Sequence, residues 1–573
     1  DKTPAFAWWV PYVIRKRNRI INKLKSKYWS RTHKYGIRIP KNVAEALEID
    51  RENGNTLWWD AIMLEMKNVR PAFEVYEGDI KKLVGYQKIK CHFVFDVKLG
   101  ENFRRKARLV GGGHTTDPPS SLTYSSVVSR DSVRILLLIA ALNGLDILTC
   151  DIQNAYLTAE CREKIYTIAG PEFGSEEGSV MLVKMALYGL KSSGAAFRSK
   201  LANVIYEMGY RPSLADPDVW MRPGTKVDGF RYYEYILCYV DDVLVISDDP
   251  ETTITGLKYV FKLKGDKAVV PDMYLGATLT KVESPSGSEC WSISSEGYVK
   301  TAIGNVEKRL EENNLKLPSK CPTPTTHKYR PEDDQTKHLE GDDITYFQEL
   351  IGVLRWAIEI GRADILLEVA LLSSQLAAPR VGHMEQVYHI FGYLKKHPKR
   401  KLYMDPDHPE ISENRFKKFD WEDFYWGSKE PIPTNIPKTL GRAVALHCFV
   451  DADHASDKVS RRSQTGIIVF GNKAPLIMYS KKQNSVQTST FGSEFMAMRQ
   501  AVEIVQALRF KLRMFGIPLD GPASMYCDNE AVYKNIVHPD SVLKKKHHSV
   551  AYHMCREAVA SEMIRVAKES SET

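Results

Sequence analysis

Apolar runs of different periodicity along the chain predict both helices and strands. Residues 131–144 (DSVRILLLIAALNG) predict a helix, with Asp131 as its N-cap and Gly144 as its C-cap. The next run, LDILTCDIQNAYL (145–157), is rich in branched side chains and predicts a strand. Residues 233–247 (YEYILCYVDDVLVIS) predict two apolar strands joined by a tight turn at Asp241-Asp242. A hairpin and a further strand therefore follow the first long helix.

The rest of the chain separates into regions of different pattern. Residues 1–80 predict helical pieces, among them WWDAIMLEMKNV (58–69), and helical periodicity dominates residues 345–397. From about residue 441, strand and helix patterns alternate as in an α/β fold. Turn-forming and Pro-rich stretches between these regions suggest boundaries near residues 57, 285 and 440.

Composition indicates a globular chain of several domains. A length of 573 residues predicts about three or four domains, and 43% apolar with 26% charged residues argues against disorder. No apolar run reaches the roughly 18 residues that a bilayer span needs, so we expect no membrane partner. The nine cysteines are scattered without Cys-x-x-Cys spacing, which favours a reducing, intracellular compartment. The chain begins at Asp1 without an initiator Met or a signal pattern, and we interpret it as a fragment of a longer product.

The positive charge is clustered rather than uniform. The formal net charge is +9, and basic residues crowd residues 15–32, 104–108, 394–401 and 544–548. Such clusters bind polyanions, because Lys and Arg replace the counterions of a phosphate backbone. Solvated helix faces are the alternative for any single cluster.

Three acidic residues near the predicted hairpin suggest metal chemistry. Asp241 and Asp242 are adjacent between apolar strands, where their mutual repulsion is relieved by a hard cation with oxygen ligands; an exposed acidic turn is the alternative. Asp151 ends another apolar run, and two-metal nucleotidyl transfer requires carboxylates from at least two strands. Tyr156, five residues later, is placed either to close against a nucleotide sugar or to pack in the core.

A second acidic set occurs in the C-terminal region. Asp451 follows the strand-like run ALHCFV, Glu494 opens the helical run EFMAMRQAVEIVQAL, and Asp528 follows SMYC. Backbone geometry at strand and helix ends can converge such side chains on one metal site. Helix capping or solvation is the alternative for any one of them.

Six motifs in sequence order resemble the reverse transcriptase of copia-type LTR retrotransposons. They are KARLV (106–110), SSVVSRDSVRILLLIAAL (125–142), DIQNAYL (151–157), LYGLKSS (187–193), YVDD (239–242) and YLG (274–276). The resemblance covers residues 58 to about 280 and implies an α+β multidomain, right-hand polymerase. Its fingers and palm would be residues 58–285, and its thumb and connection residues 286–440. Residues 1–57 would be an N-terminal helical extension, belonging to the polymerase or to the tail of an integrase.

The resemblance also implies roles for individual residues. Asp151 and Asp241 would bind both catalytic metals, with Asp242 alongside, and Tyr156 would exclude a ribose 2′-hydroxyl. Lys106 and Arg108 would grip the triphosphate, a role that suits a bidentate guanidinium. Two Mg²⁺ per active site are implied, with Mn²⁺ as an alternative.

The C-terminal region resembles ribonuclease H, which implies an α/β ribonuclease H-like domain at residues 441–573. The segments VDADH, STFGSEFMAM, CDNEAV and YHMCRE are close to the copia-type version. The resemblance implies that Asp451, Glu494 and Asp528 hold two Mg²⁺ and activate water for RNA cleavage.

Two segments depart from the family pattern. The family continues its Leu-Tyr-Gly-Leu-Lys with Gln and then Ser-Pro-Arg, whereas residues 192–195 here are SSGA, which puts fidelity or activity level in question. Ser549 stands where the last metal-binding Asp of the nuclease is expected. The second metal would then be held weakly, with either His547 or His548 assisting, or the nuclease would be slow or inactive.

The combined expectation is an RNA-directed DNA polymerase (reverse transcriptase) with an appended ribonuclease for RNA–DNA hybrids. Its expected partners are an RNA template, a DNA primer, the hybrid, deoxynucleoside triphosphates, and the integrase and capsid protein of the same element. The expected location is a cytoplasmic virus-like particle, with the nucleus as a second location. A non-catalytic or domesticated nucleic-acid-binding copy that keeps the fold is the main alternative. A nuclease with a vestigial polymerase is disfavoured, because the nuclease set is the incomplete one.

Overall fold

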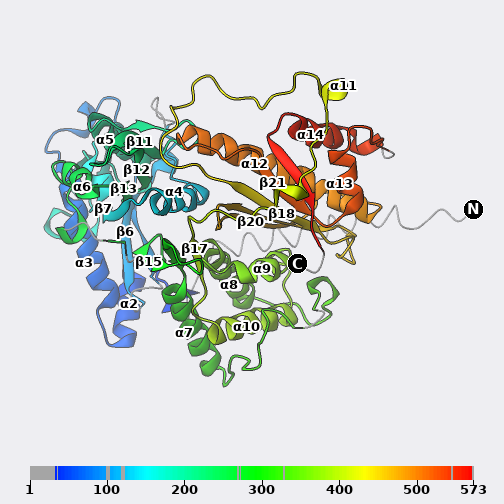
Figure 1. Cartoon of the computed structure of the whole chain (residues 1–573). Coiled ribbons are helices and arrows are strands. Elements are labelled where there is room, and N and C mark those ends of the chain that lie inside the picture. Colours follow the sequence, from blue (N-terminus) through cyan, green and yellow to red (C-terminus); the bar gives the residue numbers. More distant parts are fainter. Residues whose placement is uncertain are drawn as a thin grey trace, which may run out of the picture.

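The structure is a computed structural model that describes residues 33–34, 37–98, 103–117, 123–266, 270–271, 273–326, 329–543 and 546–570. It has the expected mixed helix and strand architecture with several packed units (Figure 1). The predicted basic segment 15–32 and part of the segment 544–548 lie outside the described residues. None of the described helices has the length and apolar character needed to cross a lipid bilayer.

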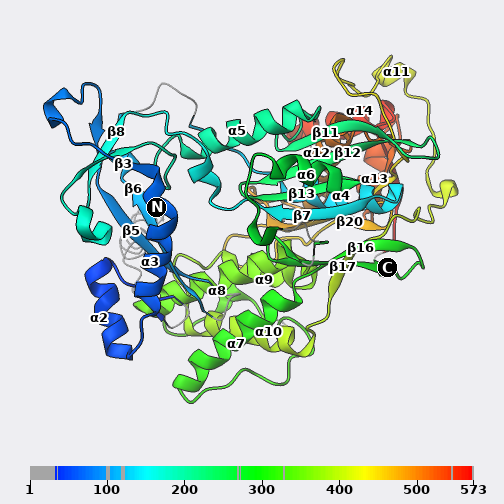
Figure 2. The same cartoon turned by 90° about the vertical axis from the view of Figure 1, so that its left-hand side faces the viewer.

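An N-terminal unit carries two helices and short strands at one end of the molecule (Figure 2). Strands β5 and β6 form an antiparallel hairpin, and β3, β9, β8 and β4 form a small sheet in that order. Trp58, in the first turn of α3, is 1% exposed and lies edge-on to Phe95 of the hairpin. The elements are β1 (His33–Lys34), β2 (Ile37–Arg38), α2 (Val43–Asn53), α3 (Leu57–Val69), β3 (Phe73–Val75), β4 (Gln87–Lys88), β5 (Cys91–Val97), β6 (Arg105–Gly111), β8 (Ile165–Ile168) and β9 (Val180–Val183).

A five-stranded antiparallel sheet, here called the central sheet, has the order β10-β11-β12-β13-β7. Its strands are β7 (Asp146–Asp151), β10 (Arg211–Pro212), β11 (Val219–Thr225), β12 (Arg231–Tyr239) and β13 (Asp242–Ser247), and its helices are α4 (Arg130–Asn143), α5 (Ser193–Glu207) and α6 (Pro250–Lys258). Both faces are buried: Leu244 and Ile246 pack into the core that contains α4, and Val243 and Val245 pack into the core of α5 and α6. Alternate side chains of one strand therefore serve two cores.

The N-cap of helix α4 lies two residues before the predicted one. Ser129 is the N-cap of α4, with its hydroxyl accepting from the backbone N–H of Ser132 (3.3 Å). The prediction that Asp131 caps the helix was wrong, because Asp131 lies in the first turn, where a carboxylate instead faces the positive end of the helix dipole. Gly144 is confirmed as the C-cap, with φ of 60°.

The hairpin turn lies one residue before the predicted Asp-Asp position. Tyr239 pairs with Asp242, so Val240 and Asp241 form the two-residue turn and Asp242 opens β13. Two-residue hairpin turns require a positive φ at the first position, and Val240 supplies it at 57°, a strained value for a β-branched residue. Asp241 therefore stands at the tip of the hairpin.

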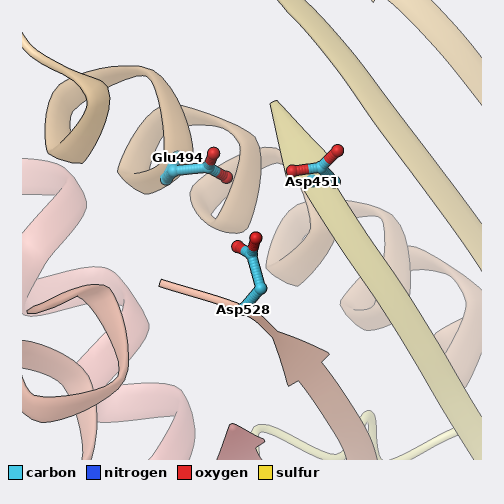
Figure 3. Close-up of side chains that lie close together, drawn as sticks. All are labelled: Asp451, Glu494 and Asp528. Atoms are coloured by element: carbon cyan, nitrogen blue, oxygen red, sulfur yellow. The ribbon is translucent and has the colours of Figure 1, made fainter. Parts of the chain in front are cut away.

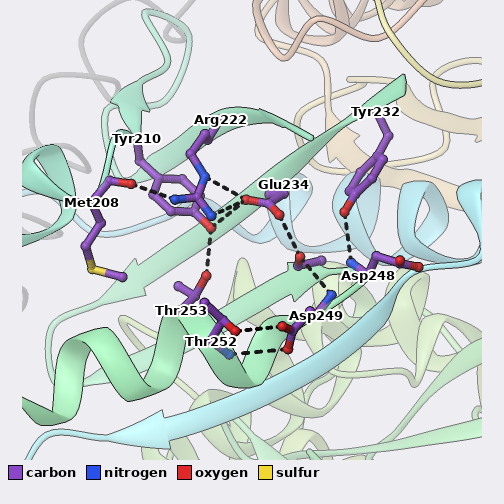
Figure 4. A network of polar contacts seen from close by, with 10 residues as sticks. Met208, Tyr210, Arg222, Tyr232, Glu234, Asp248, Asp249, Thr252 and Thr253 are labelled. Carbon is purple, nitrogen blue, oxygen red and sulfur yellow. Dashed lines mark hydrogen bonds and ion pairs between the residues drawn. The ribbon is translucent and has the colours of Figure 1, made fainter. Parts of the chain in front are cut away.

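A polar network fixes the central sheet away from this tip (Figure 4). Glu234 of β12 accepts from the Arg222 side chain (2.8 Å), the Tyr210 hydroxyl (3.1 Å) and the Ser247 hydroxyl (2.9 Å). The Tyr210 hydroxyl also lies 2.9 Å from the hydroxyl of Thr253 on α6. These hydrogen bonds thus join strands β11, β12 and β13 to one another and to α6.

A second sheet connects the central sheet to a group of helices. Strands β14 (Met273–Tyr274), β15 (Ala277–Glu283), β16 (Glu289–Ser294) and β17 (Lys401–Met404) form it in sequence order. The helices α7 (Glu296–Glu312), α8 (Asp342–Glu359), α9 (Leu366–Ser373) and α10 (Val381–Lys396), here called the helical unit, share one apolar core. They are inserted between β16 and β17, and the predicted boundary at residue 285 falls in the turn between β15 and β16.

The C-terminal unit is a five-stranded mixed sheet with helices (Figure 1). Its strand order is β20-β19-β18-β21-β22; the first three strands are antiparallel, and β18, β21 and β22 are parallel. The elements are β18 (Leu446–Ala452), β19 (Gln464–Gly471), β20 (Ala474–Lys482), α12 (Thr490–Met514), β21 (Ala523–Cys527), α13 (Glu530–Val537), α14 (Ser549–Ala560) and β22 (Ile564–Lys568). A long connection with the short helix α11 (Glu422–Tyr425) leads into it from β17.

The C-terminal unit and the central sheet share a single apolar core, which also contains α4. The Tyr235 hydroxyl donates to the carbonyl of Phe515 (2.7 Å). The buried Arg134 side chain donates to the carbonyls of Leu476 (3.1 Å) and Glu359 (2.8 Å). Arg134 thereby joins α4, β20 and the end of α8, and the packing predicts that these parts unfold together.

Replacing Arg134 with Met should lower the free energy of unfolding by about 2–4 kcal/mol, because two buried carbonyls lose their donor. Arg130→Met is the matched control: its ion pair with Glu359 (2.7 Å) is half exposed, and its loss should cost under about 1 kcal/mol. Chemical denaturation measures both values. Equal losses in the two variants would contradict the assigned role of Arg134.

His447 on β18 should make the fold sensitive to acid. Its ring stacks on Phe470 (centroids 4.9 Å apart), and burial lowers its pKa to about 4. Because the unfolded chain takes up this proton near pH 6.5 and the folded chain does not, stability should fall by up to about 3 kcal/mol as the pH drops from 6.5 to 4. His447→Phe should flatten this part of the stability–pH curve, and an unchanged slope would refute the prediction.

Candidate active sites

The first acidic set meets at the end of two neighbouring strands. Asp151 of β7 and Asp242 of β13 are directly opposite one another in antiparallel register. The backbone N–H of Ile152 donates to the carbonyl of Asp241 (2.8 Å), which fixes the hairpin tip beside the end of β7. The register therefore places Asp151 beside Asp241 and Asp242, which come much later in the sequence, at one end of the central sheet.

Burial and the charges of neighbouring carboxylates act on Asp241 and Asp242. Burial raises the pKa of Asp242 to about 6, and the negative charges of Asp241 and Asp151 add to the effect. Burial also raises the pKa of Asp241. The ammonium group of Lys264 lies 3.3 Å from a carboxylate oxygen of Asp151 and supplies part of the missing positive charge. Hard oxygen ligands of this kind fit Mg²⁺ or Mn²⁺, whose charge would offset the repulsion among the three carboxylates.

A cavity of about 390 Å³ joins these carboxylates to a basic wall. Asp151 and Asp241 line it together with Lys106 and Arg108, which alternate along β6. Burial, with the charges of Arg108 and Lys98, lowers the pKa of Lys106 to about 8. Acidic residues at one side and basic residues at the other can hold a cation-bound polyphosphate between them.

Tyr156 lies behind this cavity rather than on its lining. It is in the short helical turn Ala155–Thr158 after β7. The N-cap of this turn is Asn154, with φ of 52°. Its ring contacts the Tyr188 ring, with centroids 4.7 Å apart, and Tyr188 itself lines the cavity. The motif LYGLKSS was recognised in the sequence, but no role was predicted for Tyr188. Sequence spacing does not reveal a contact between side chains of different loops.

The segment that departs from the family pattern forms the start of α5. The Ser192 hydroxyl donates to Glu163 (2.5 Å), and a side chain at Gly194 would lie 3.2 Å from Ser125 and 3.9 Å from the Tyr156 hydroxyl. The segment SSGA thus lies next to Tyr156, and its small residues leave room for the Tyr156 side chain.

The second acidic set converges from three elements (Figure 3). Asp451 ends β18, Glu494 lies in the first turns of α12, and Asp528 follows β21; one carboxylate oxygen of each lies within 4.8 Å of the others. Among the described residues, this is the only group of three or more His, Cys, Asp or Glu side chains that close. The predicted convergence of these residues is therefore present in the structure.

The electrostatics of this set also favour a cation. Burial and the charges of Asp451 and Asp528 raise the pKa of Glu494 to about 8, although the backbone N–H of Ala452 donates to it (3.0 Å). Carboxylate oxygens fit Mg²⁺, and a bound divalent ion would stabilise the ionised trio. A cavity of about 650 Å³, lined by Asp451 and Asp528 on one side and by Leu367 and Glu368 of α9 on the other, gives access to it.

Ser549 and its neighbours form the start of α14. Ser549 is the first residue of the helix and is exposed. The buried ring of His548 lies 6.0 Å from that of Phe495 on α12, whereas the His547 side chain lies outside the described residues. His548 therefore packs between α14 and α12.

Comparison with known proteins gives matches over most of the chain. The family model "Reverse transcriptase (RNA-dependent DNA polymerase)" matches residues 78–307. The Retrovirus-related Pol polyprotein from transposon RE1 of Arabidopsis thaliana is 26% identical, over 84% of this chain and 30% of its own length. The corresponding protein from transposon TNT 1-94 of Nicotiana tabacum is 26% identical, over 85% of this chain and 34% of its own length. The chain thus spans about a third of the length of these relatives.

One solved structure overlaps with a smaller part. The crystal structure of LC11-RNase H1 in complex with RNA/DNA hybrid covers 22% of this chain and 86% of its own, at 13% identity and a TM-score of 0.19. At that score the overlap supports no conclusion about the fold, so the character of the C-terminal unit has to be argued from its own strand order and acidic residues.

Proposed function

We propose that the chain is a copia-type retrotransposon reverse transcriptase, an RNA-directed DNA polymerase with an appended ribonuclease for RNA–DNA hybrids. The observation that carries the proposal is the cross-strand pair of Asp151 and Asp242 beside Asp241, with Asp151, Asp241, Lys106 and Arg108 lining one cavity. It combines an acidic metal site with a basic phosphate site, as nucleotidyl transfer requires.

The units of the structure correspond to parts of a right-handed polymerase in this proposal. The N-terminal unit supplies the fingers, the central sheet the palm, and the helical unit with the second sheet the thumb and connection. The predicted ranges 58–285, 286–440 and 441–573 describe this division in sequence, with β15 and β16 pairing across its first boundary.

Each polymerase residue has a separate task. Asp151, Asp241 and Asp242 hold two Mg²⁺, with Mn²⁺ as an alternative. When bound, these ions neutralise charge on the attacking and leaving oxygens. Lys106 and Arg108 bind the triphosphate of the incoming deoxynucleotide and orient it toward the primer 3′-hydroxyl. Tyr156 excludes a ribose 2′-hydroxyl.

The C-terminal unit is the ribonuclease H-like domain in this proposal. Three antiparallel strands followed by two parallel ones, with acids at the ends of β18 and β21 and on α12, support this. Asp451, Glu494 and Asp528 hold Mg²⁺ there, and the metal, when bound, supplies activated water for cleavage of the RNA strand.

The proposal also covers the partners and the site of action of the chain. The nucleic-acid partners are an RNA template, a DNA primer and their hybrid. Integrase and capsid protein of the same element are the protein partners. The site of action is a cytoplasmic virus-like particle, with the nucleus as a second location.

Asp241→Asn should reduce Mg²⁺-dependent deoxynucleotide incorporation on a primed homopolymer template by about 100-fold or more, because it removes a metal ligand and a charge. Asp248→Asn is the matched control at the opposite end of the same hairpin, where Asp248 pairs with Lys226 (3.3 Å); it should retain wild-type incorporation. Primer extension measures both.

If wild type and Asp241→Asn give the same background, the chain is not a polymerase under these conditions. Binding of the primed template in a mobility-shift assay would then favour the alternative, a nucleic-acid-binding copy that retains the fold. The departures at residues 192–195 and at Ser549 are what favour that alternative.

Ser549→Asp should raise cleavage of an RNA–DNA hybrid by about tenfold, since it restores a carboxylate where the family carries one. Ser549→Ala should match wild type, and Glu494→Gln should abolish cleavage. A gel assay with a labelled hybrid compares the four proteins. Equal cleavage by wild type and Ser549→Asp, both above Glu494→Gln, would show that Ser549 does not limit the nuclease.

A further inference from the structure

Arg108, Tyr188 and Tyr156 contact one another in a row at the polymerase cavity, and Phe197 continues the row. The guanidinium carbon of Arg108 lies 4.3 Å from the centre of the Tyr188 ring, on its face. The Tyr188 ring meets the Tyr156 ring at 4.7 Å, and Tyr156 in turn lies 6.1 Å from Phe197 of α5. Tyr188 therefore lies between the residue proposed to bind phosphate and the residue proposed to read the sugar.

The backbone holds Tyr188 in this position firmly. Its carbonyl accepts from the N–H of Gly111, at the end of the strand that carries Arg108 (2.8 Å). Gly189 follows with φ of 87°, and a Cβ there would lie 2.4 Å from the Gly111 carbonyl oxygen. Only glycine permits this approach, so the loop before α5 is fixed to β6 at the point where Tyr188 projects.

The two rings have different surroundings. Tyr188 lines the cavity with Asp151 and Asp241, while Tyr156 is set behind it. Burial raises the pKa of both tyrosines. The Arg108 guanidinium lies over the face of the Tyr188 ring, where a cation gains most, and the Tyr156 ring meets the Tyr188 ring at an interplanar angle of 51°.

We propose that Tyr188 is a positioning residue, whose ring couples the triphosphate grip of Arg108 to the sugar gate of Tyr156. The inference rests on the proposed polymerase function and deepens it. The ring restricts the Arg108 guanidinium to one orientation over the cavity and holds Tyr156 in the position from which it excludes a 2′-hydroxyl. Nucleotide affinity and sugar selection then depend on one side chain that belongs to neither contact.

Because the ring rather than the hydroxyl has this role, the test compares a variant that keeps the ring with one that removes it. Tyr188→Phe keeps the ring and should have wild-type kinetics. Tyr188→Leu removes it and should raise the KM for dTTP about tenfold with kcat changed less than about twofold, the size expected from a lost cation–ring contact. The same variant should incorporate UTP relative to dTTP more often than wild type does, by a similar factor.

A matched control exists on α5. Tyr206 lies under Arg211, with the guanidinium carbon 3.7 Å from its ring centre, on the exposed side of the helix. Tyr206→Leu therefore removes the same kind of contact away from the cavity and should leave both KM values and kcat unchanged. Thermal unfolding of all variants identifies any general loss of fold.

Steady-state kinetics of the full chain with Mg²⁺, a primed poly(A) template and dTTP or UTP test the proposal, together with Arg108→Ala and the double variant Arg108→Ala/Tyr188→Leu. If Tyr188 acts through Arg108, the double variant has the dTTP KM of Arg108→Ala alone. Multiplying effects on KM, unchanged sugar selection in Tyr188→Leu, or loss of activity in Tyr188→Phe would each overturn the proposal. A wild-type chain that incorporates no dTTP would instead overturn the polymerase function itself, and the inference with it.

Discussion

The register between β7 and β13 is the constraint on which the first candidate site depends. Because side chains alternate along a strand, a slip of one residue would turn Asp242 away from Asp151 and exchange the two faces of β13. The packing makes that slip costly, since Leu244 and Val245 belong to different cores and both are fully buried. The apolar residues that flank the acids therefore do more than surround them: they determine which carboxylates meet.

The two acidic sites are assembled to different degrees. At the central sheet, strand pairing places the carboxylates together, and Lys264 lies against Asp151. At the C-terminal unit, the three oxygens already converge within 4.8 Å, although this is the set whose fourth family position is a serine. Completeness of a motif and closeness of its side chains are thus separate properties. The first follows from residue identity, and the second from how rigidly strand and helix ends are packed.

Much of the local structure could be predicted from sequence, and the failures have physical causes. Strands and helices with strong periodicity and the glycine C-cap at Gly144 were foreseen, as was the meeting of the acids. The N-cap was displaced by two residues and the hairpin turn by one, because Ser129 competes with Asp131 and Val240 accepts a strained φ that local preference disfavours. The pairing of β16 with β17 was missed, since the helical unit separates them in sequence. The same limit hid Tyr188, whose partners come from two other elements.

The shared apolar core also determines how the two sites are related in space. α4 packs with the central sheet on one side and the C-terminal unit on the other, and Arg134 adds hydrogen bonds to β20 and α8. Such burial on both sides of one helix joins the two units as layers of one body, whereas a flexible linker would leave their separation variable. The long connection through α11 is consequently not what positions the C-terminal unit. Glu430 of that connection pairs with Arg509 (2.7 Å) and fixes it along α12 instead. The distance between the two sets of acids is set by side-chain packing around α4, and a hybrid that reaches both must fit a separation that the core has already fixed.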